Sequence, residues 1–285
     1  MHNITNRAAA VLFDMDGVLI DSNEVIERAW RETADMYGKT ISEDEIIKHI
    51  HGQPGPHTIR ALFSDLPLVD QQKVQAHIIH VENTASYNPI PGVSELITAL
   101  DAAGVRVGIV TSGWREKIDR VTAMLQVQSC ISVIVERDDV SRGKPFPDPY
   151  LLAAERLDLP AEKTIVFEDS KSGVTSAVAA GAFCVGIGGV ELIPCGARLA
   201  IPDFTGVEVI SRLDGNTAIS FCPDHILIID KKRYVSGIRV ELKGSLMEVA
   251  QKRALGCYNI IFSEWVCNRC LGSTNCPTGF TLSHY

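Results

Sequence analysis

The sequence predicts an α/β protein with a parallel-sheet core, an inserted α-helical cap and a small C-terminal α+β appendage. From about residue 88 to residue 189, short apolar segments alternate with segments of helical length and pattern. That alternation is typical of βαβ units and a parallel sheet. Residues 23–87 have a helical, polar pattern in which nothing resembles a strand. This block therefore looks like an insertion that covers one edge of the sheet.

The expected elements follow in chain order. A buried strand spans residues 8–13 and leads into the helical block, where Ser42 and Glu45 form a capping box that starts a helix near Glu43. The chain breaks at Pro54-Gly55-Pro56. The core then contains helices and strands in alternation. We expect helices within 88–104, 114–125, 148–159 and 172–181, and strands within 105–113, 131–140, 164–170 and 183–189.

Three regions result from this pattern. We expect a catalytic core made of residues 1–21 and 88–212, a helical cap of residues 22–87, and a C-terminal extension of residues 213–285 without an assigned fold. In the extension the βα rhythm fades. The segments "HILIID" and "IRVEL" carry enough β-branched residues to form strands. Either they pair within the chain, or the extension binds a protein partner.

Composition and charge narrow the functional classes. The chain has 285 residues, 46% of them hydrophobic, and a formal net charge of -8, which disfavours nonspecific binding to nucleic acid. It contains no run of 18 apolar residues of the kind that spans a membrane. The first residues lack a secretory pattern, and so we expect a cytoplasmic protein.

A cysteine-rich segment near the C-terminus suggests a metal site. Cys267 and Cys270 have Cys-x-x-Cys spacing, and Cys257 and Cys276 are available as further ligands for Zn²⁺. The second pair lacks the standard spacing. Reduced thiols or a disulfide are the alternatives.

Polar residues follow four of the predicted strands or the loops after them. They are Asp14 and Asp16, then Thr111, Ser112 and Gly113, then Lys144, and finally Glu168 and Asp169. In a parallel sheet all of these positions lie at the same edge, where ligands bind in open α/β folds.

These residue types suit phosphoryl transfer. Carboxylate oxygens form an octahedral Mg²⁺ site, and the metal and a lysine neutralise phosphate charge in the transition state. One carboxylate can act as the nucleophile and a second can transfer the proton. A threonine hydroxyl and the backbone amides of Ser112 and Gly113 can bind phosphate oxygens. Each motif alone is also common as a turn, a calcium-type loop or a helix cap. Four such motifs in this order are not.

The segments "FDMDGVLIDS", "IVTSG", "GKPFPDPY" and "VFEDSKSGV" resemble the four motifs of the haloacid dehalogenase superfamily of phosphotransferases, over about residues 8–212. The resemblance implies a Rossmann-like core with a helical cap after the first motif. It also implies that Asp14 is the nucleophile and Asp16 the general acid/base, while Thr111 and Lys144 bind phosphate. The implied Mg²⁺ ligands are the Asp14 side chain, the Asp16 carbonyl and Asp169, with Glu168 close by or coordinating.

Within this family, Asp16 indicates the reaction. Dehalogenases have no leaving oxygen to protonate, and phosphonate-cleaving members use a cap lysine, so neither resembles this chain. A phosphatase and a sugar phosphomutase of the β-phosphoglucomutase type share all the core residues, and the cap decides between them. We expect a Mg²⁺-dependent phosphatase acting on a small phosphorylated sugar or polyol, with the mutase as the alternative.

The cap gives weaker indications of the substrate. "HGQPGPHTIRAL" and "TSGWREK" are similar to glycerol-phosphate and deoxysugar-phosphate phosphatases. That group often carries an arginine and an acidic residue where this chain has Gln53 and His57. The candidate substrate-binding residues are His51, His57, Arg60 and Arg115. The alternative is that they are ordinary polar residues of helix surfaces.

Overall fold

A six-stranded parallel sheet forms the centre of the molecule. The computed structural model describes residues 7–211, 216–221 and 225–229. The sheet has the strand order β6-β5-β2-β7-β8-β9, and every neighbouring pair is parallel. Its strands are β2 (Ala10–Phe13), β5 (Arg106–Val110), β6 (Ile131–Val135), β7 (Thr164–Glu168), β8 (Phe183–Ile187) and β9 (Leu199–Ile201). The predicted parallel α/β core is confirmed.

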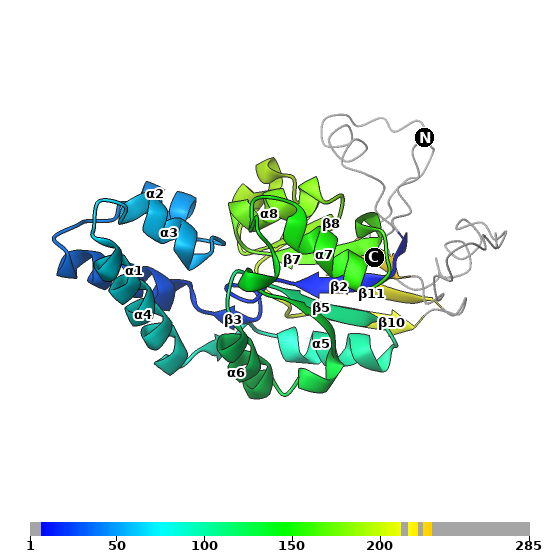
Figure 1. The fold of residues 1–285 in the computed structure, drawn as a ribbon. Helices are drawn as coiled ribbons and strands as arrows, with labels where there is room; N and C mark the ends of the chain where they lie inside the picture. The colour runs from blue at the N-terminus through cyan, green and yellow to red at the C-terminus, as the bar shows by residue number, and fades with distance from the viewer. Residues whose placement is uncertain (1–6, 212–215, 222–224, 230–285) are drawn as a thin grey trace, which may run out of the picture.

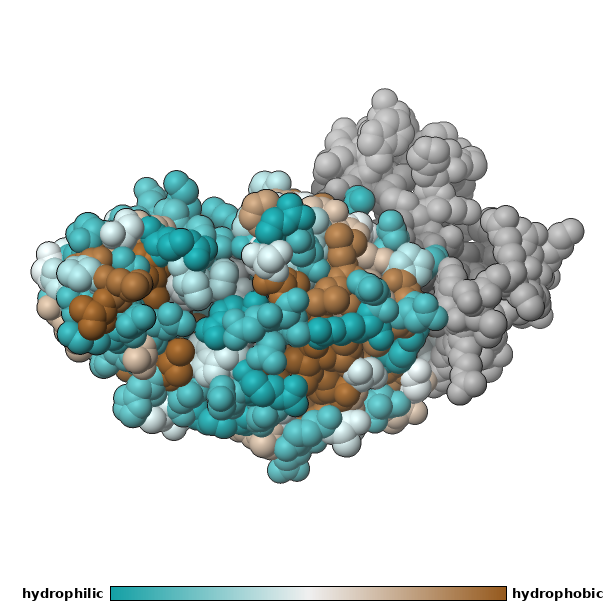
Figure 2. Space-filling view, in the orientation of Figure 1, coloured by the Kyte–Doolittle hydropathy of each residue, from teal (hydrophilic) through white to brown (hydrophobic). Residues whose placement is uncertain are grey.

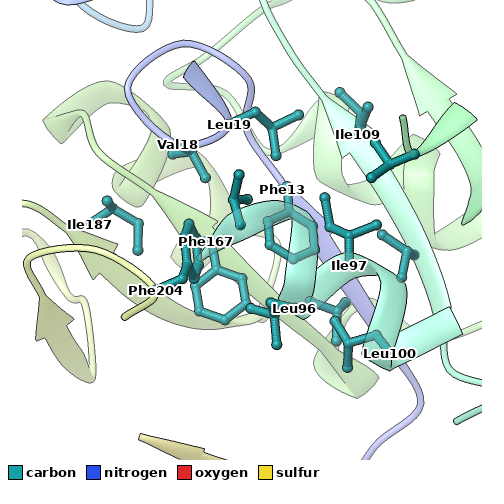
Figure 3. Packing of buried hydrophobic residues seen from close by; sticks show 14 of the residues in the cluster. Phe13, Val18, Leu19, Leu96, Ile97, Leu100, Ile109, Phe167, Ile187 and Phe204 are labelled. Atoms are coloured by element: carbon teal, nitrogen blue, oxygen red, sulfur yellow. The ribbon is translucent and has the colours of Figure 1, made fainter. Parts of the chain in front are cut away.

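Side chains alternate between the two faces of this sheet, as the period of a strand requires. Val11 and Phe13 of β2 lie in one buried cluster, whereas Ala10 and Leu12 lie in another. Two helices cover each face (Figure 1). The first cluster includes residues of α5 (Val93–Ala102) and α6 (Arg115–Leu125), and the second includes residues of α7 (Asp148–Arg156) and α8 (Lys171–Ala179). In Figure 3, Phe13 and Phe167 stack beneath α5, with ring centroids 5.0 Å apart.

The inserted segment folds into four helices with a core of its own. They are α1 (Asn23–Met36), α2 (Glu43–His49), α3 (Gly55–Leu62) and α4 (Leu68–Thr84), and they lie beside the carboxyl edge of the sheet (Figure 1). Trp30 and Phe63 pack together inside this cap. The predicted capping box of Ser42 and Glu45 is present at the start of α2. Two short antiparallel strands, β3 (Ile20–Asp21) and β4 (Asn88–Pro89), connect the cap to the core.

A second sheet packs against the buried cluster on the α5 side of the first sheet. Its order is β1-β12-β11-β10, formed by β1 (Arg7–Ala8), β10 (Val207–Ser211), β11 (Thr217–Phe221) and β12 (His225–Ile229). The boundary expected at residue 212 falls between β10 and β11, which pair antiparallel over their whole length. Ile219, Phe221 and Ile229 are at most 1% exposed and belong to the core cluster under α5.

The predicted strand at residues 225–230 therefore pairs inside this chain. β12 lies between β11 and β1, antiparallel to the first and parallel to the second. The segment "IRVEL" and the four cysteines proposed for Zn²⁺ (Cys257, Cys267, Cys270 and Cys276) lie outside the described residues. Short 3-10 turns complete the described chain at Gln128–Cys130, Arg137–Asp139, Ala161–Lys163 and Val190–Cys195.

The surface view shows hydrophilic residues over much of both cap and core, with small hydrophobic groups between them (Figure 2). Among the described residues, no helix combines the length and apolar character needed to cross a bilayer. The apolar side chains instead fill three buried clusters, one on each face of the sheet and one in the cap.

Candidate active site

The polar residues predicted at the strand ends meet at the carboxyl end of β2. This strand is where the chain order reverses, since β5 and β6 lie on one side and β7, β8 and β9 on the other. Such a switch point is the usual ligand site of an open α/β sheet. Asp14 follows β2 and its backbone amide donates to the Phe167 carbonyl at 3.0 Å. Thr111 follows β5 in the same way, with its amide bonded to the Val135 carbonyl at 2.9 Å.

Lys144 joins two of these strand ends. Its Nζ donates to Asp14 Oδ1 at 2.6 Å, to Glu168 Oε1 at 2.5 Å and to the Val110 carbonyl at 3.1 Å. The Tyr150 hydroxyl also donates to Glu168 Oε1, at 2.7 Å. The lysine is 3% exposed. A buried ammonium of this kind is stable only when paired, and here both carboxylates surround it.

The carboxylates of Asp14, Glu168 and Asp169 form a cluster in which their oxygens lie within 4.8 Å of one another. Lys144 supplies one positive charge against three negative ones. Burial, together with neighbouring Glu168 and Asp16, raises the pKa of Asp14 to about 7. Burial and the charge of Glu168 also raise the pKa of Asp169 well above its ordinary value. The site thus has an excess of negative charge that a divalent cation would neutralise.

This donor set fits Mg²⁺, which prefers carboxylate and carbonyl oxygens. The backbone also approaches the carboxylates closely. A Cβ atom added to Gly17, whose φ is +73°, would lie 1.9 Å from Asp169 Oδ2. A Cβ on Gly173 would lie 1.9 Å from Glu168 Oε1. Only glycine at these two positions leaves the carboxylates where they are.

Thr111, Ser112 and Gly113 lie at the same site as these carboxylates. Each of them already forms a hydrogen bond with another group of the protein. The Gly113 amide, expected to face a phosphate oxygen, donates to Thr111 Oγ1 at 3.0 Å. The Ser112 hydroxyl donates to the carbonyl of Gly52, a cap residue, at 3.0 Å. Accepting from Gly113 leaves the Thr111 hydroxyl proton available as a donor.

Asp16 is held by residues that the sequence did not single out. Its Oδ1 accepts from Ser22 Oγ at 2.6 Å and from Lys117 Nζ at 2.6 Å. Lys117 Nζ also lies 2.6 Å from Glu82 Oε2, at the end of the cap helix α4. Asn23 likewise contributes from the start of α1, because its Nδ2 donates to Asp169 Oδ2 at 2.9 Å.

A signal for Lys117 and Glu82 was present in the helical pattern. Lys117 is four residues before Val121 on the buried side of α6. Glu82 is four residues after Ile78 on the buried side of α4. A charged residue in line with an apolar stripe indicates a buried partner, but the sequence does not say which partner.

The cap and the core enclose a cavity of about 570 Å³, counted with the solvent at its mouth. Its lining comprises Asp14, Asp16, Asn23, Ile26, Trp30, Ile50, His51, Gly52, Gln53, Gly55, Glu82, Thr111, Ser112, Gly113, Trp114 and Asp169. The cap loop is docked on the core, since Gln53 Nε2 donates to Ser172 Oγ at 2.9 Å. The catalytic candidates thus lie at the bottom of a partly closed pocket.

Of the four candidate substrate-binding residues, one lines the pocket and three lie outside its lining. His51 lines the pocket and its Nε2 lies 2.9 Å from Glu27 Oε1. His57 is outside the lining and packs on His49, with ring nitrogens 3.1 Å apart. Arg60 is exposed and also outside the lining, and Arg115 turns to Asp119 at 2.9 Å, in an exposed ion pair.

Comparison with known proteins matches residues 11–187 to the family model described as haloacid dehalogenase-like hydrolase. A phosphorylated carbohydrates phosphatase from Thermotoga maritima is 36% identical over 60% of this chain and 81% of its own length. Hexitol phosphatase A from Escherichia coli is 33% identical over 64% of this chain and 83% of its own. The crystal structure of a hydrolase from Pseudomonas syringae superposes with a TM-score of 0.62 at 26% identity, over 68% of this chain and 94% of its own. The matched region contains all four strand-end motifs, and the chain therefore belongs to the haloacid dehalogenase-like hydrolases.

Proposed function

We propose that this chain is a Mg²⁺-dependent phosphatase that hydrolyses a small phosphorylated sugar or polyol through an aspartyl-phosphate intermediate. The observation that carries the proposal is that Asp14 and Asp169 line a pocket covered by a cap, with Lys144 paired to Asp14 behind that lining. The names of the two phosphatase relatives support the same substrate class.

Asp14 is the proposed nucleophile. Its carboxylate would attack phosphorus, and the bond from phosphorus to the substrate oxygen would break. Lys144 contacts Asp14 Oδ1, and so its ammonium is placed to offset the negative charge of both the nucleophile and the phosphoryl group. We assign phosphate binding to Lys144, Thr111, Ser112 and Gly113, which requires the Gly113 amide to exchange its hydrogen bond to Thr111 Oγ1 for one to phosphate.

Asp16 is the proposed general acid and base. It would give a proton to the leaving oxygen in the first step and take one from water in the second. That water would attack phosphorus and release phosphate from Asp14. The pocket position of Asp16, two residues beyond Asp14, suits both transfers.

We assign Mg²⁺ to the Asp14 and Asp169 side chains and the Asp16 backbone carbonyl, with Glu168 as a further carboxylate of the cluster. When bound, the metal would supply positive charge for the phosphoryl oxygens. Glu168 is at the same time occupied by Lys144 and Tyr150, so its main task is to hold the lysine in place.

The pocket suits a small polyhydroxylated substrate. Ile26 of the cap and Trp114 of the core, both half-buried, offer apolar surface, and His51 and Gln53 offer polar groups. Pockets for sugar-sized ligands commonly combine an apolar wall with a few polar groups that fix orientation. We also propose that residues 22–87 act as the specificity-determining cap.

A phosphate-release screen with Mg²⁺ tests the proposal over phosphorylated sugars, polyols and nucleotides. We expect release from sugar or polyol phosphates, and chromatography of the products identifies the reaction. Free sugar and phosphate indicate a phosphatase. Isomerised sugar phosphate, formed only with a bisphosphate primer, would instead identify the mutase. No product from any substrate would contradict both.

A further inference from the structure

Outside the cluster around Asp14, Lys117 is the most deeply buried charged side chain of the described residues. Its side chain is 0% exposed, yet it belongs to α6 of the core and contacts a residue of the cap. Nζ lies 2.6 Å from Asp16 Oδ1 and 2.6 Å from Glu82 Oε2. The rings of Tyr87 and Trp114 lie 5.4 and 5.7 Å from the same nitrogen. Among the described residues, these charged and aromatic neighbours of the ammonium come from the loop after β2, from the cap side and from the start of α6.

The ammonium stays charged in this position. Burial opposes the charge, but Asp16 and Glu82 together hold the pKa of Lys117 above its ordinary value. Two carboxylates at hydrogen-bond distance offset the loss of hydration. Within the described part of the chain, removing Glu82 would leave the lysine paired with Asp16 alone.

The contacts of Asp16 show what this lysine does for the site. Ser22 and Lys117 both donate to Oδ1. Two donors on the same oxygen fix the plane of the carboxylate and leave Oδ2 as the oxygen for proton exchange with a substrate in the pocket. An acid must stand within hydrogen-bond reach of the leaving oxygen, so this orientation decides how well it works.

Other contacts already anchor the end of α4 to the core. Arg120 donates to the carbonyl of Ala85 at 2.8 Å and to those of Glu82 and Asn83. Trp114 Nε1 donates to Asn83 Oδ1 at 3.1 Å. These contacts hold the cap against the core at this point, so Lys117 is not needed to attach it.

We propose that Lys117 is a positioning residue that orients the Asp16 carboxylate for proton transfer, and that Glu82 couples this orientation to the docked cap. The inference rests on the proposed phosphatase function. In the first step, Asp14 forms a bond to phosphorus, the bond to the leaving oxygen breaks, and Asp16 Oδ2 delivers a proton to that oxygen. Lys117 touches neither phosphorus nor the leaving group. The effect of Lys117 on the rate should therefore depend on whether the leaving oxygen must be protonated as its bond to phosphorus breaks.

The test compares two leaving groups in a single turnover. The Lys117→Met variant keeps the length of the side chain and removes its charge. With the best sugar or polyol phosphate of the screen, we expect first-turnover release of the alcohol to slow by roughly 10- to 100-fold, a fraction of the full effect of a general acid. With p-nitrophenyl phosphate, whose leaving group needs no proton, release should change less than about 3-fold.

The matched control is Lys73→Met. Lys73 lies on α4, is exposed and pairs with Asp70 at 2.8 Å, so the same substitution there should leave both rates unchanged. Glu82→Gln should also slow release of the alcohol more than release of p-nitrophenol, but by a smaller factor than Lys117→Met does. If Lys117→Met fails to fold, the double variant with Glu82→Gln removes the orphaned carboxylate as well and serves in its place.

Equal losses with both leaving groups would overturn the proposal, because they would place Lys117 in phosphate binding or in the fold. No loss with either would overturn it too. Failure of the proposed function is separate, since the wild-type protein would then release no phosphate from any substrate of the screen.

Discussion

Lys144 Nζ lies 2.6 Å from Asp14 Oδ1, and both side chains are almost fully buried. This contact brings together two residues that are 130 positions apart in the chain. It also leaves the site short of positive charge, because Glu168 and Asp169 complete the same cluster. The stability of the metal-free protein should depend on that imbalance.

In EDTA, we expect the folded protein to lose stability as the pH rises. The pKa of Asp14 is raised from 3.8 to about 7 on folding. The folded state therefore binds this proton more tightly than the unfolded chain does, and the stabilisation present at low pH disappears between these two values. A shift of this size corresponds to about 4 kcal/mol in all, of which about 3 kcal/mol is lost between pH 5 and pH 8. Thermal unfolding at about pH 5 and about pH 8, for wild type and Asp14→Asn, measures it, and the variant should show a weaker fall.

Mg²⁺ should reverse this loss. A ligand at 100 times its Kd stabilises the folded state by about 2.7 kcal/mol. We expect the Mg²⁺-induced rise in melting temperature to vanish in Asp169→Asn and to persist in Asp119→Asn, an exposed residue of α6. An equal rise in all three proteins would show that the ion binds elsewhere.

Gly52 tests whether docking of the cap loop matters for turnover. Its φ is +69°, and a Cβ atom there would lie 2.2 Å from Ser170 Oγ in the core. Gly52→Ala should lower kcat/KM by roughly 10- to 100-fold, because the loop is displaced from the site. Gly38 has a φ of +65° and no atom within 4 Å of the added Cβ. Gly38→Ala thus carries the same backbone strain, about 1 kcal/mol, without the clash.

Steady-state kinetics and thermal unfolding of both alanine variants separate the two effects. Gly38→Ala should lose only the stability that the backbone strain costs and keep its activity, whereas Gly52→Ala should lose at least as much stability and also lose activity. Full activity of Gly52→Ala would mean that the docked loop position is not needed for catalysis.

Phe221 tests whether the strands after residue 212 belong to the core. It is 1% exposed and its ring centroid lies 6.1 Å from that of Phe167 in β7. Phe221→Ala should cost about 3 to 5 kcal/mol of unfolding free energy. Phe146, which is 48% exposed, is the control, and Phe146→Ala should cost less than about 1 kcal/mol. Chemical denaturation measures both, and similar values for the two would contradict the observed packing.

The core of the fold was predictable because its strands are short, apolar and regularly spaced. The residues at strand ends were predictable for the same reason, since parallel strands bring Asp14, Thr111 and Glu168 to one edge. The hydrogen bonds within that edge were not. The Gly113 amide donates to Thr111, a local turn geometry that the letters Thr-Ser-Gly do not specify.

Contacts between cap and core were the least predictable. Lys117 and Glu82 are 35 residues apart and meet only because α4 returns to the core beside α6. The candidate residue Arg115 stands two positions before Lys117 and points to Asp119 instead. Whether Arg115 or Lys117 points to the site depends on the residue at which α6 begins. The amphipathic pattern of the sequence does not determine that residue. The strand at residues 225–230 was predicted, but its partners were not, because β12 pairs on one side with β1 from the opposite end of the described chain.

The nucleophile assignment is the central claim, and one rate tests it most directly. Phosphate release by Asp14→Asn is measured with Mg²⁺ on the best substrate of the screen, after circular dichroism has shown that the variant is folded. The account predicts a rate at least about 1,000-fold below that of wild type, because a neutral amide cannot form the aspartyl-phosphate. Turnover within about 10-fold of wild type would contradict it.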